Sequence, residues 1–248
     1  MHPILFELGP LKVYSYGLMV ALGFIAATYL VRLEASRQDI NPQKLVNLVF
    51  VLTISGILGA RILYIFQNLN LYIKNPWEIV MLHKGGLSFY GGFILATICA
   101  IVFLKRQHLS VLKVFDLVAP YLALAQAIGR IGCLLNGCCY GKPTDSLFSL
   151  YFPGEKFARY PVQIYASLSL LSMFIILRTF QAKQWRRTKI LGQTFLLYCL
   201  LYAISRFFME YLRGDTSPIL ANLTIHQLIS IGIIVISAGC LWKKMTKK

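Results

Sequence analysis

The stretch LVNLVFVLTISGILGARILYIF, from Leu45 to Phe66, contains a single charged residue, Arg61. A helix of roughly 20 mostly apolar residues is long enough to cross the hydrocarbon core of a membrane. Other stretches of this kind lie on both sides of it, and the predicted spans are Tyr14–Val31, Leu45–Phe66, Leu87–Leu104, Val114–Leu135, Val162–Phe180, Leu191–Met209 and Leu223–Trp242. The sequence therefore predicts an all-α integral membrane protein with seven transmembrane helices, forming a single polytopic domain over residues 1–248.

The composition supports this class and argues against a soluble nucleic-acid-binding protein. Hydrophobic residues make up 57% of the 248 residues and charged residues only 14%, whereas soluble domains carry about 25% charged residues. The formal net charge is +16, but the basic residues concentrate in connectors and in the tail, so we expect no nucleic-acid partner. Residues Met1–Lys12 lack the basic and apolar segments of a cleavable signal peptide. We therefore expect the first span not to be cleaved off and to stay in the membrane as an anchor.

The distribution of Lys and Arg predicts the orientation in the membrane. The connectors Leu177–Ile190 and Leu104–Val114 are strongly basic, while Phe152–Tyr160 and Arg213–Pro218 are nearly balanced in charge. Basic connectors stay on the cytoplasmic side. We therefore expect the N-terminus outside, the C-terminus inside, and a small exoplasmic head at about Gly137–Pro161.

Charged residues within the predicted spans are the strongest signal of a functional site, because each is costly in a membrane. Tyr202, Arg206, Glu210 and Arg213 are spaced four, four and three residues apart, which places them on one stripe of a helix. Arg130 lies near the outer end of another span. Arg130 and Arg206, from different spans, could hold a phosphate group through their planar guanidinium groups. The structural alternative is an ion pair between Arg206 and Glu210, with Arg130 and Arg213 extending their charges to the membrane interface.

Small residues mark two further features. Ser55, Gly56, Gly59 and Ala60 predict close contact between helices, and Arg61 beside them could serve either structure or substrate binding. Four glycines within Gly85–Gly92 suggest non-helical backbone at the entrance of a span, although ordinary turns also explain such pairs.

The six cysteines give no redox or zinc motif. None of them forms a C-x-x-C pair, so we disfavour a thiol oxidoreductase and expect no metal ligand. Residues Cys99, Cys199 and Cys240 lie in apolar runs and are expected to pack as small hydrophobic side chains. Three others cluster at Cys133, Cys138 and Cys139.

Several segments together resemble the prolipoprotein diacylglyceryl transferase family over nearly the whole chain. The most specific is GRIGCLLNGCCYG from Gly129 to Gly141, together with the stripe around Arg206. The other matching segments, in the order of the family, are YGLM (Tyr16–Met19), GAR (Gly59–Arg61), GGLSFYGG (Gly85–Gly92), RYPVQIY (Arg159–Tyr165) and RFFME (Arg206–Glu210).

This resemblance implies a reaction and a location. The lipobox cysteine of a prelipoprotein would attack the glyceryl carbon of phosphatidylglycerol that bears the phosphate, forming a thioether and releasing glycerol 1-phosphate, in the bacterial inner membrane. The partners would be phosphatidylglycerol and the signal peptides of prelipoproteins, with no cofactor. The expected catalytic residues are Arg130, Arg206, Tyr202, Tyr90 and Glu210, and the expected substrate-binding residues are Arg130, Arg206, Tyr16, Arg61, Asn136, Gly141 and Arg213.

The chain departs from the family pattern at three positions. The family often has Asn at Cys133 and Glu at Cys138, and many members have His where this chain has Tyr90. A tyrosine with a pKa near 10 is mostly protonated at neutral pH, so we expect Tyr90 to orient the substrate rather than to act as a base. The alternative function from another class is a lipid or anion transporter that uses the intramembrane arginines.

Overall fold

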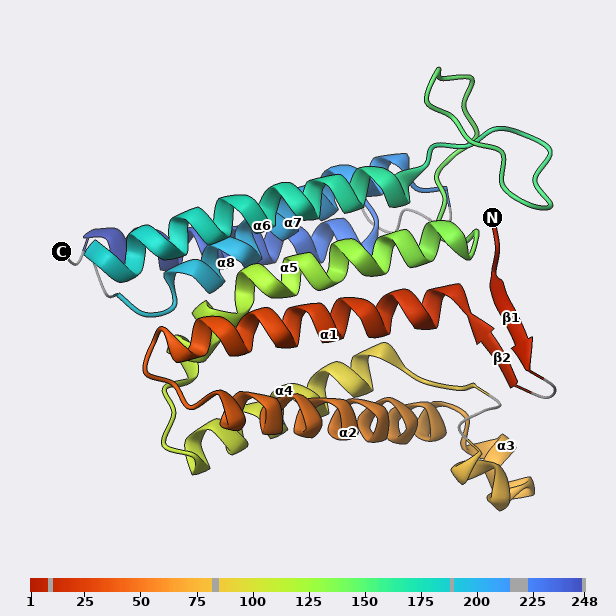
Figure 1. Ribbon diagram of the computed structural model, residues 1–248. Helices are drawn as coiled ribbons and strands as arrows, with labels where there is room; N and C mark the ends of the chain where they lie inside the picture. Colours follow the sequence, from red (N-terminus) through yellow and green to blue (C-terminus); the bar gives the residue numbers. More distant parts are fainter. Residues whose placement is uncertain (9–10, 82–84, 188–189, 215–222, 247–248) are drawn as a thin grey trace. The chain divides into compact units, whose positions relative to one another are not determined.

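Figure 1 shows the computed structural model, which describes residues 1–8, 11–81, 85–187, 190–214 and 223–246. All seven predicted spans are helices that are long and apolar enough to cross a membrane. They are α1 (Ser15–Ser36), α2 (Pro42–Gln67), α4 (Phe89–Arg106), α5 (Val111–Leu135), α6 (Val162–Arg187), α7 (Gln193–Leu212) and α8 (Ile225–Thr246). The predicted all-α membrane fold with seven spans is confirmed.

Four short elements have no clear signal in the sequence. Strands β1 (Ile4–Leu8) and β2 (Leu11–Tyr14) pair antiparallel directly before α1. The short helix α3 (Leu69–Lys74) and the 3₁₀ turn η1 (Pro76–Val80) follow α2. Of the residues used to predict orientation, Lys189, 215–218 and 247–248 lie outside the described residues.

The chain forms two compact units, which are described separately: residues 32–114, and residues 1–31 together with 115–248. In the first unit α2 packs directly on α4. A Cβ atom added to Gly59 would lie 2.6 Å from the Cβ of Leu95, and one added to Gly92 would lie 2.8 Å from the backbone oxygen of Gly56. Only glycine allows so close an approach, so the predicted packing role of these small residues is confirmed.

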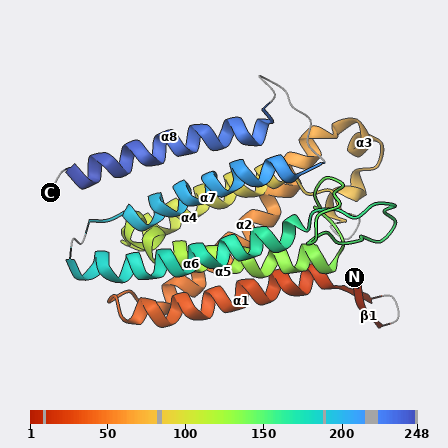
Figure 2. The same ribbon diagram turned by 90° about the horizontal axis from the view of Figure 1, so that it is seen from above.

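The second unit is layered from α1 through α5, α6 and α7 to α8 (Figure 2). Helix α1 approaches α5 at Gly23, where an added Cβ would lie 2.8 Å from the backbone oxygen of Ala125. A stripe of alanines on α5 faces α6 and α7, which lets these helices pack closely. The core cluster comprises Ala119, Ala123, Ala127, Leu170, Met173, Leu177 and Tyr198.

Asp116 of α5 joins these helices through its carboxylate, which has no exposed surface. It accepts hydrogen bonds from the backbone N–H of Gly192 (2.6 Å) and of Phe195 (2.8 Å), and from Nε2 of Gln184 (3.0 Å). The first N–H groups of a helix lack partners within the helix. Asp116 therefore caps the start of α7 from a different helix, and it fixes α7 against α5. Our sequence analysis did not single out this residue.

We expect Asp116→Ala to lower the thermal unfolding midpoint of the protein in detergent. The variant leaves buried N–H groups unpaired, and a hydrogen bond to a charged group contributes about 1.5–3 kcal/mol. The exposed Asp145 provides a matched control, since Asp145→Ala removes the same carboxylate without a buried partner. Differential scanning fluorimetry measures both, and equal midpoints for the two variants would contradict the capping role.

Candidate functional site

One cavity in the larger unit is lined by four of the ten predicted site residues. The space around it amounts to about 370 Å³, part of which is open to the surroundings, and the room for water-sized spheres within it is about 30 Å³. Its polar wall contains Arg130 from α5, Tyr202 and Arg206 from α7, and Arg213 just after α7. The remaining lining residues are Val162, Ala166, Leu170, Ser205 and Met209. The cavity thus joins a cationic end to an apolar wall.

Glu210 positions Arg206 through an ion pair. The two side chains form an ion pair of 2.9 Å, in which the Arg206 side chain is 20% exposed and the Glu210 side chain is fully buried. The hydroxyl of Thr224, at the start of α8, donates a second contact of 3.0 Å to Glu210. Because a buried carboxylate needs such partners, Glu210 fixes Arg206 and leaves part of its guanidinium facing the cavity.

The cavity carries an excess of positive charge. Arg130, Arg206 and Arg213 line it, whereas Glu210 pairs with Arg206 from outside the lining. Among the described residues no carboxylate pairs with Arg130. An arginine offers planar donors that match the oxygen atoms of phosphate or carboxylate. The arrangement can therefore bind an anionic group with an apolar extension.

The loop after α5 begins with a specific helix cap. The N–H of Cys138 donates to the backbone oxygen of Cys133 (3.1 Å), and the N–H of Gly137 donates to that of Leu134 (3.1 Å). With Gly137 at a φ of 70°, this is a Schellman cap, which needs a left-handed residue after the last turn. The cap turns the chain back over the end of α5.

Asn136 and Tyr16 lie beside this cap. Asn136 is the residue before Gly137, and its side chain hydrogen-bonds the thiol of Cys138. Tyr16, in the first turn of α1, packs its backbone on α5, since a Cβ added to Gly132 would lie 3.3 Å from its Cα. Its hydroxyl interacts electrostatically with Arg130. Both predicted residues thus adjoin the cationic end of the larger unit without lining the cavity.

Gly141 positions Arg213 through the backbone. The two residues form an antiparallel bridge, flanked by a hydrogen bond of 2.8 Å from the N–H of Lys142 to the backbone oxygen of Leu212. A Cβ at position 141 would lie 2.6 Å from that oxygen and 2.7 Å from the Cβ of Tyr160. Only glycine fits here. The family-implied importance of Gly141 therefore has a steric reason.

A polar network stabilises the head that follows. The hydroxyl of Tyr140 donates to Glu155 (2.6 Å), Arg159 pairs with the same carboxylate (2.6 Å), and the Arg159 guanidinium lies 4.9 Å from the centre of the Tyr140 ring. The hydrogen bond from Tyr140, followed by those from Arg159, holds the pKa of Glu155 below its ordinary value. Arg159 also donates to the backbone oxygen of Gly141 (3.3 Å), so the network supports the bridge to Arg213.

The cysteine cluster adjoins the cap. The Cys133 thiol, which hydrogen-bonds Cys139, lowers the pKa of the Cys139 thiol to about 5, and the charges of Arg213 and Arg130 act in the same direction. Burial raises the pKa of the Cys138 thiol. Of the other cysteines, Cys99 and Cys199 are half-buried, but Cys240 is exposed, so its predicted core packing was wrong.

Arg61 belongs to the smaller unit, where it is 6% exposed. Its guanidinium donates to the backbone oxygens of Gly85 (2.6 Å), Gly86 (3.0 Å) and Glu78, and its Nε donates to that of Ile79 (3.0 Å). These contacts hold the connector before α4 in place. The structural alternative thus has direct support, while substrate binding by Arg61 stays a prediction.

Tyr90 lies in the first turn of α4 in the same smaller unit, and its side chain is 53% exposed. Its ring contacts Phe89 edge-on at 5.8 Å. Gly85 and Gly86 before it have φ values of 82° and 81°, whereas Gly91 and Gly92 lie inside α4. The prediction of non-helical backbone is therefore correct for the first pair of glycines and wrong for the second.

Sequence reasoning missed three residues that shape the site. Thr224 binds Glu210, Ser205 lines the cavity, and Gln163 of α6 donates from Nε2 to the backbone oxygen of Cys138 (2.6 Å) while being 1% exposed. Ser205 lies three residues after Tyr202, so the helical spacing could have included it. The other two contacts join distant segments and leave no local pattern.

We expect Gly141→Ala to loosen the segment around the bridge, because the added methyl group overlaps backbone atoms. Overpacking of this kind costs about 1–3 kcal/mol, which corresponds to amide exchange roughly 5- to 150-fold faster if it is expressed locally. Hydrogen exchange read by mass spectrometry on peptides containing Lys142 measures the effect. Gly232→Ala is the control, since an added Cβ there meets nothing within 4 Å. Unchanged protection in Gly141→Ala would refute the steric account.

Known proteins support the resemblance seen in the sequence. The family model described as "Prolipoprotein diacylglyceryl transferase" matches residues 3–243. A phosphatidylglycerol–prolipoprotein diacylglyceryl transferase of Clostridium tetani is 39% identical over 243 residues, covering 95% of this chain and 95% of the relative. One of Clostridium perfringens is 38% identical over 240 residues (95% and 92%), and one of Staphylococcus aureus is 32% identical over 249 residues (96% and 87%). The chain therefore belongs to the prolipoprotein diacylglyceryl transferase family.

Proposed function

We propose that the cavity formed by α5, α6 and α7 is where this chain carries out the reaction of its family. The chain transfers the diacylglyceryl group of phosphatidylglycerol to prolipoproteins, a step of lipoprotein maturation. In chemical terms, the sulfur of the lipobox cysteine forms a bond to the glyceryl carbon, and the bond from that carbon to the phosphate oxygen breaks. The thiol proton is lost, and glycerol 1-phosphate leaves.

The observation that carries this proposal is the meeting of three arginines at the end of an apolar cavity. Phosphatidylglycerol has one anionic phosphate next to two acyl chains. Arg130, Arg206 and Arg213 suit the phosphate, while Leu170 and Met209 suit the apolar part of the lipid. The cavity therefore matches both parts of the substrate at the position where they join.

The arginines have a catalytic role in this proposal because the leaving group gains negative charge as the carbon–oxygen bond breaks. Fixed cationic donors stabilise such charge without reorganising during the reaction. Glu210 orients Arg206 through the 2.9 Å ion pair, and Arg130 approaches from α5. Tyr202 and Ser205 add neutral hydroxyl groups in the same cavity. Asn136, Tyr16 and Gly141 support this end of the unit from its periphery.

Thiol activation is assigned to no single base. Tyr90 carries a phenol, which is mostly protonated at neutral pH, so we propose that it orients the prolipoprotein segment through a hydrogen bond. The positive field of the three arginines would favour the thiolate form of an approaching cysteine. Neither role requires a cofactor.

The phosphate role predicts that Arg130→Lys and Arg206→Lys both impair turnover, and that the Ala variants impair it further. Lysine keeps the charge but loses the planar fork that binds two phosphate oxygens. One hydrogen bond between an arginine and a charged group is worth about 1.5–3 kcal/mol, or roughly 10- to 150-fold in rate if it forms only in the transition state. The assay uses purified protein, phosphatidylglycerol and a lipobox peptide, with the thioether product detected by mass spectrometry.

The same assay distinguishes this role from a purely structural one. An arginine that only extends its charge to the interface is replaced by lysine with little loss. Lys105→Arg at the end of α4 is the matched control for a change between these two cations, and we expect it to leave turnover unchanged. Wild-type turnover in both lysine variants of the site would refute the phosphate role.

We further propose that this end of the larger unit faces the outside of the bacterial cytoplasmic membrane. The basic residues Lys105 and Arg106 end α4, and Lys243 and Lys244 lie in the last turn of α8. The positive-inside rule places these ends in the cytoplasm. The loop 136–161, which joins the opposite ends of α5 and α6, then forms the exoplasmic head.

Labelling of single cysteines introduced at Lys183 and Leu147 tests this orientation. Both side chains are exposed, so a membrane-impermeant maleimide can reach each from its own side. In intact cells freed of their wall, we expect Leu147→Cys to react and Lys183→Cys to react only after the membrane is permeabilised. All six native cysteines are replaced by Ser in this background. Labelling of both sites from the same side would overturn the orientation.

A further inference from the structure

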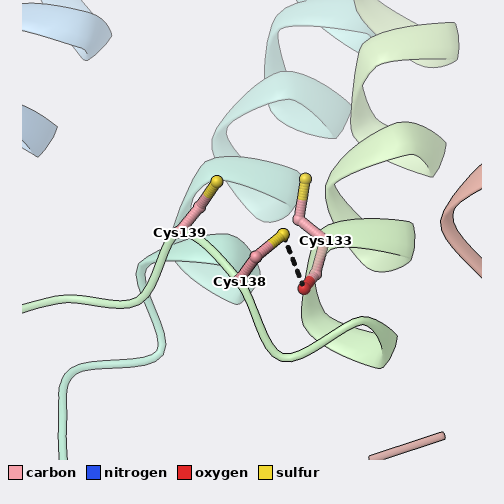
Figure 3. Close-up of side chains that lie close together, drawn as sticks. All are labelled: Cys133, Cys138 and Cys139. Carbon is pink, nitrogen blue, oxygen red and sulfur yellow. Dashed lines mark hydrogen bonds between the residues drawn. The ribbon is translucent and has the colours of Figure 1, made fainter. Parts of the chain in front are cut away.

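We propose that Cys133, Cys138 and Cys139 form a three-thiolate binding site for one soft metal ion, of which Cu(I) fits best. The three sulfur atoms lie within 4.8 Å of one another. Figure 3 shows the three side chains converging from the last turn of α5 and from the loop that follows it. None of the three cysteines lines the cavity between α5, α6 and α7.

The spacing of the sulfur atoms suits a shared ion. A metal–thiolate bond of about 2.3 Å places the sulfurs of a trigonal site about 4.0 Å apart. None of the three observed spacings exceeds 4.8 Å, so the sulfurs are already close enough for small rotations of the side chains to close the site. A disulfide requires a sulfur–sulfur distance of about 2.05 Å, and all three cysteines are free.

The backbone holds the three cysteines in place before any ion binds. The Schellman cap returns Cys138 to the end of α5, where its sulfur contacts the backbone oxygen of Cys133 at 3.6 Å. Gln163 fixes the backbone of Cys138 from α6. Cys139 has a φ of 63°, a left-handed conformation that is uncommon for residues other than glycine and that costs free energy. In this conformation the Cys139 sulfur lies within 4.8 Å of the other two.

The ligand set favours Cu(I) over Zn(II). Thiolates are soft ligands that select Cu(I), whereas structural zinc almost always has four protein ligands. Within the described residues no His, Asp or Glu joins the three cysteines. Binding of Cu(I) to three thiols releases three protons and involves no change of oxidation state. The resulting complex carries two negative charges, and Arg130 and Arg213 interact electrostatically with Cys139, so they offset that charge.

The test measures Cu(I) binding to the reduced full-length protein in detergent, under anaerobic conditions and in competition with the chromogenic chelator bicinchoninate. We expect wild type to hold one Cu(I) per chain. We expect the double variant Cys138→Ser with Cys139→Ser to lose this binding, and each single variant to bind roughly tenfold more weakly or worse. The control is Cys99→Ser with Cys240→Ser, which removes two thiols from elsewhere in the chain and should bind as wild type does.

Two further measurements keep the result interpretable. X-ray absorption at the copper edge should show three sulfur neighbours at about 2.3 Å. Transfer of diacylglyceryl to the lipobox peptide should persist in the double variant, which would show that it is folded. The proposal is overturned if wild type binds no more Cu(I) than the double variant, if the control variant loses binding equally, or if Zn(II) displaces Cu(I) at equal concentration.

Discussion

The buried carboxylate of Glu210 is the group on which the candidate site depends. A charge without exposed surface must be paired and hydrogen-bonded to be tolerated, and Glu210 obtains both from Arg206 and Thr224. The ion pair fixes the direction of Arg206, and Thr224 joins the C-terminal end of α7 to the start of α8. Arg206 faces the cavity as a consequence of this pairing. The buried charge of Glu210 therefore contributes to the local packing and positions Arg206, the cation that we propose binds the lipid phosphate.

The spans could be predicted from the sequence because their signal is local. A run such as Leu45–Phe66 has no other stable state than a helix in a membrane, since the bilayer satisfies no backbone polar group. The hairpin before α1 has no such signal, because its strands are only five and four residues long. Asp116 was missed for the opposite reason. An acid near the start of an apolar run looks like an interfacial residue, and its partners Gly192 and Phe195 lie more than 70 residues away.

The part of the site that lies on one helix was predictable, because its signal in the sequence is also local. Helical spacing alone places Tyr202, Arg206 and Arg213 on one face, and they do line one cavity. Arg130 lies on another helix, so periodicity could not supply it. It was predicted because a second arginine lies near the end of a different span, and the family resemblance then implied the same residue. The role of Gly141 was even less accessible, because it depends on the backbone of Leu212 and on the absence of a side chain. Residue types reveal the chemistry of a site, whereas its steric limits require coordinates.

The carboxylate of Asp116 also has a consequence for how the protein is made. An aspartate in the interior of a transmembrane helix costs about 2.5–3.5 kcal/mol to insert at the bilayer centre, and less toward the interface. Its partners in α7 are synthesised 76 to 79 residues later than Asp116 itself. The carboxylate of Asp116 therefore obtains its hydrogen-bond partners only after α6 and the start of α7 have been made.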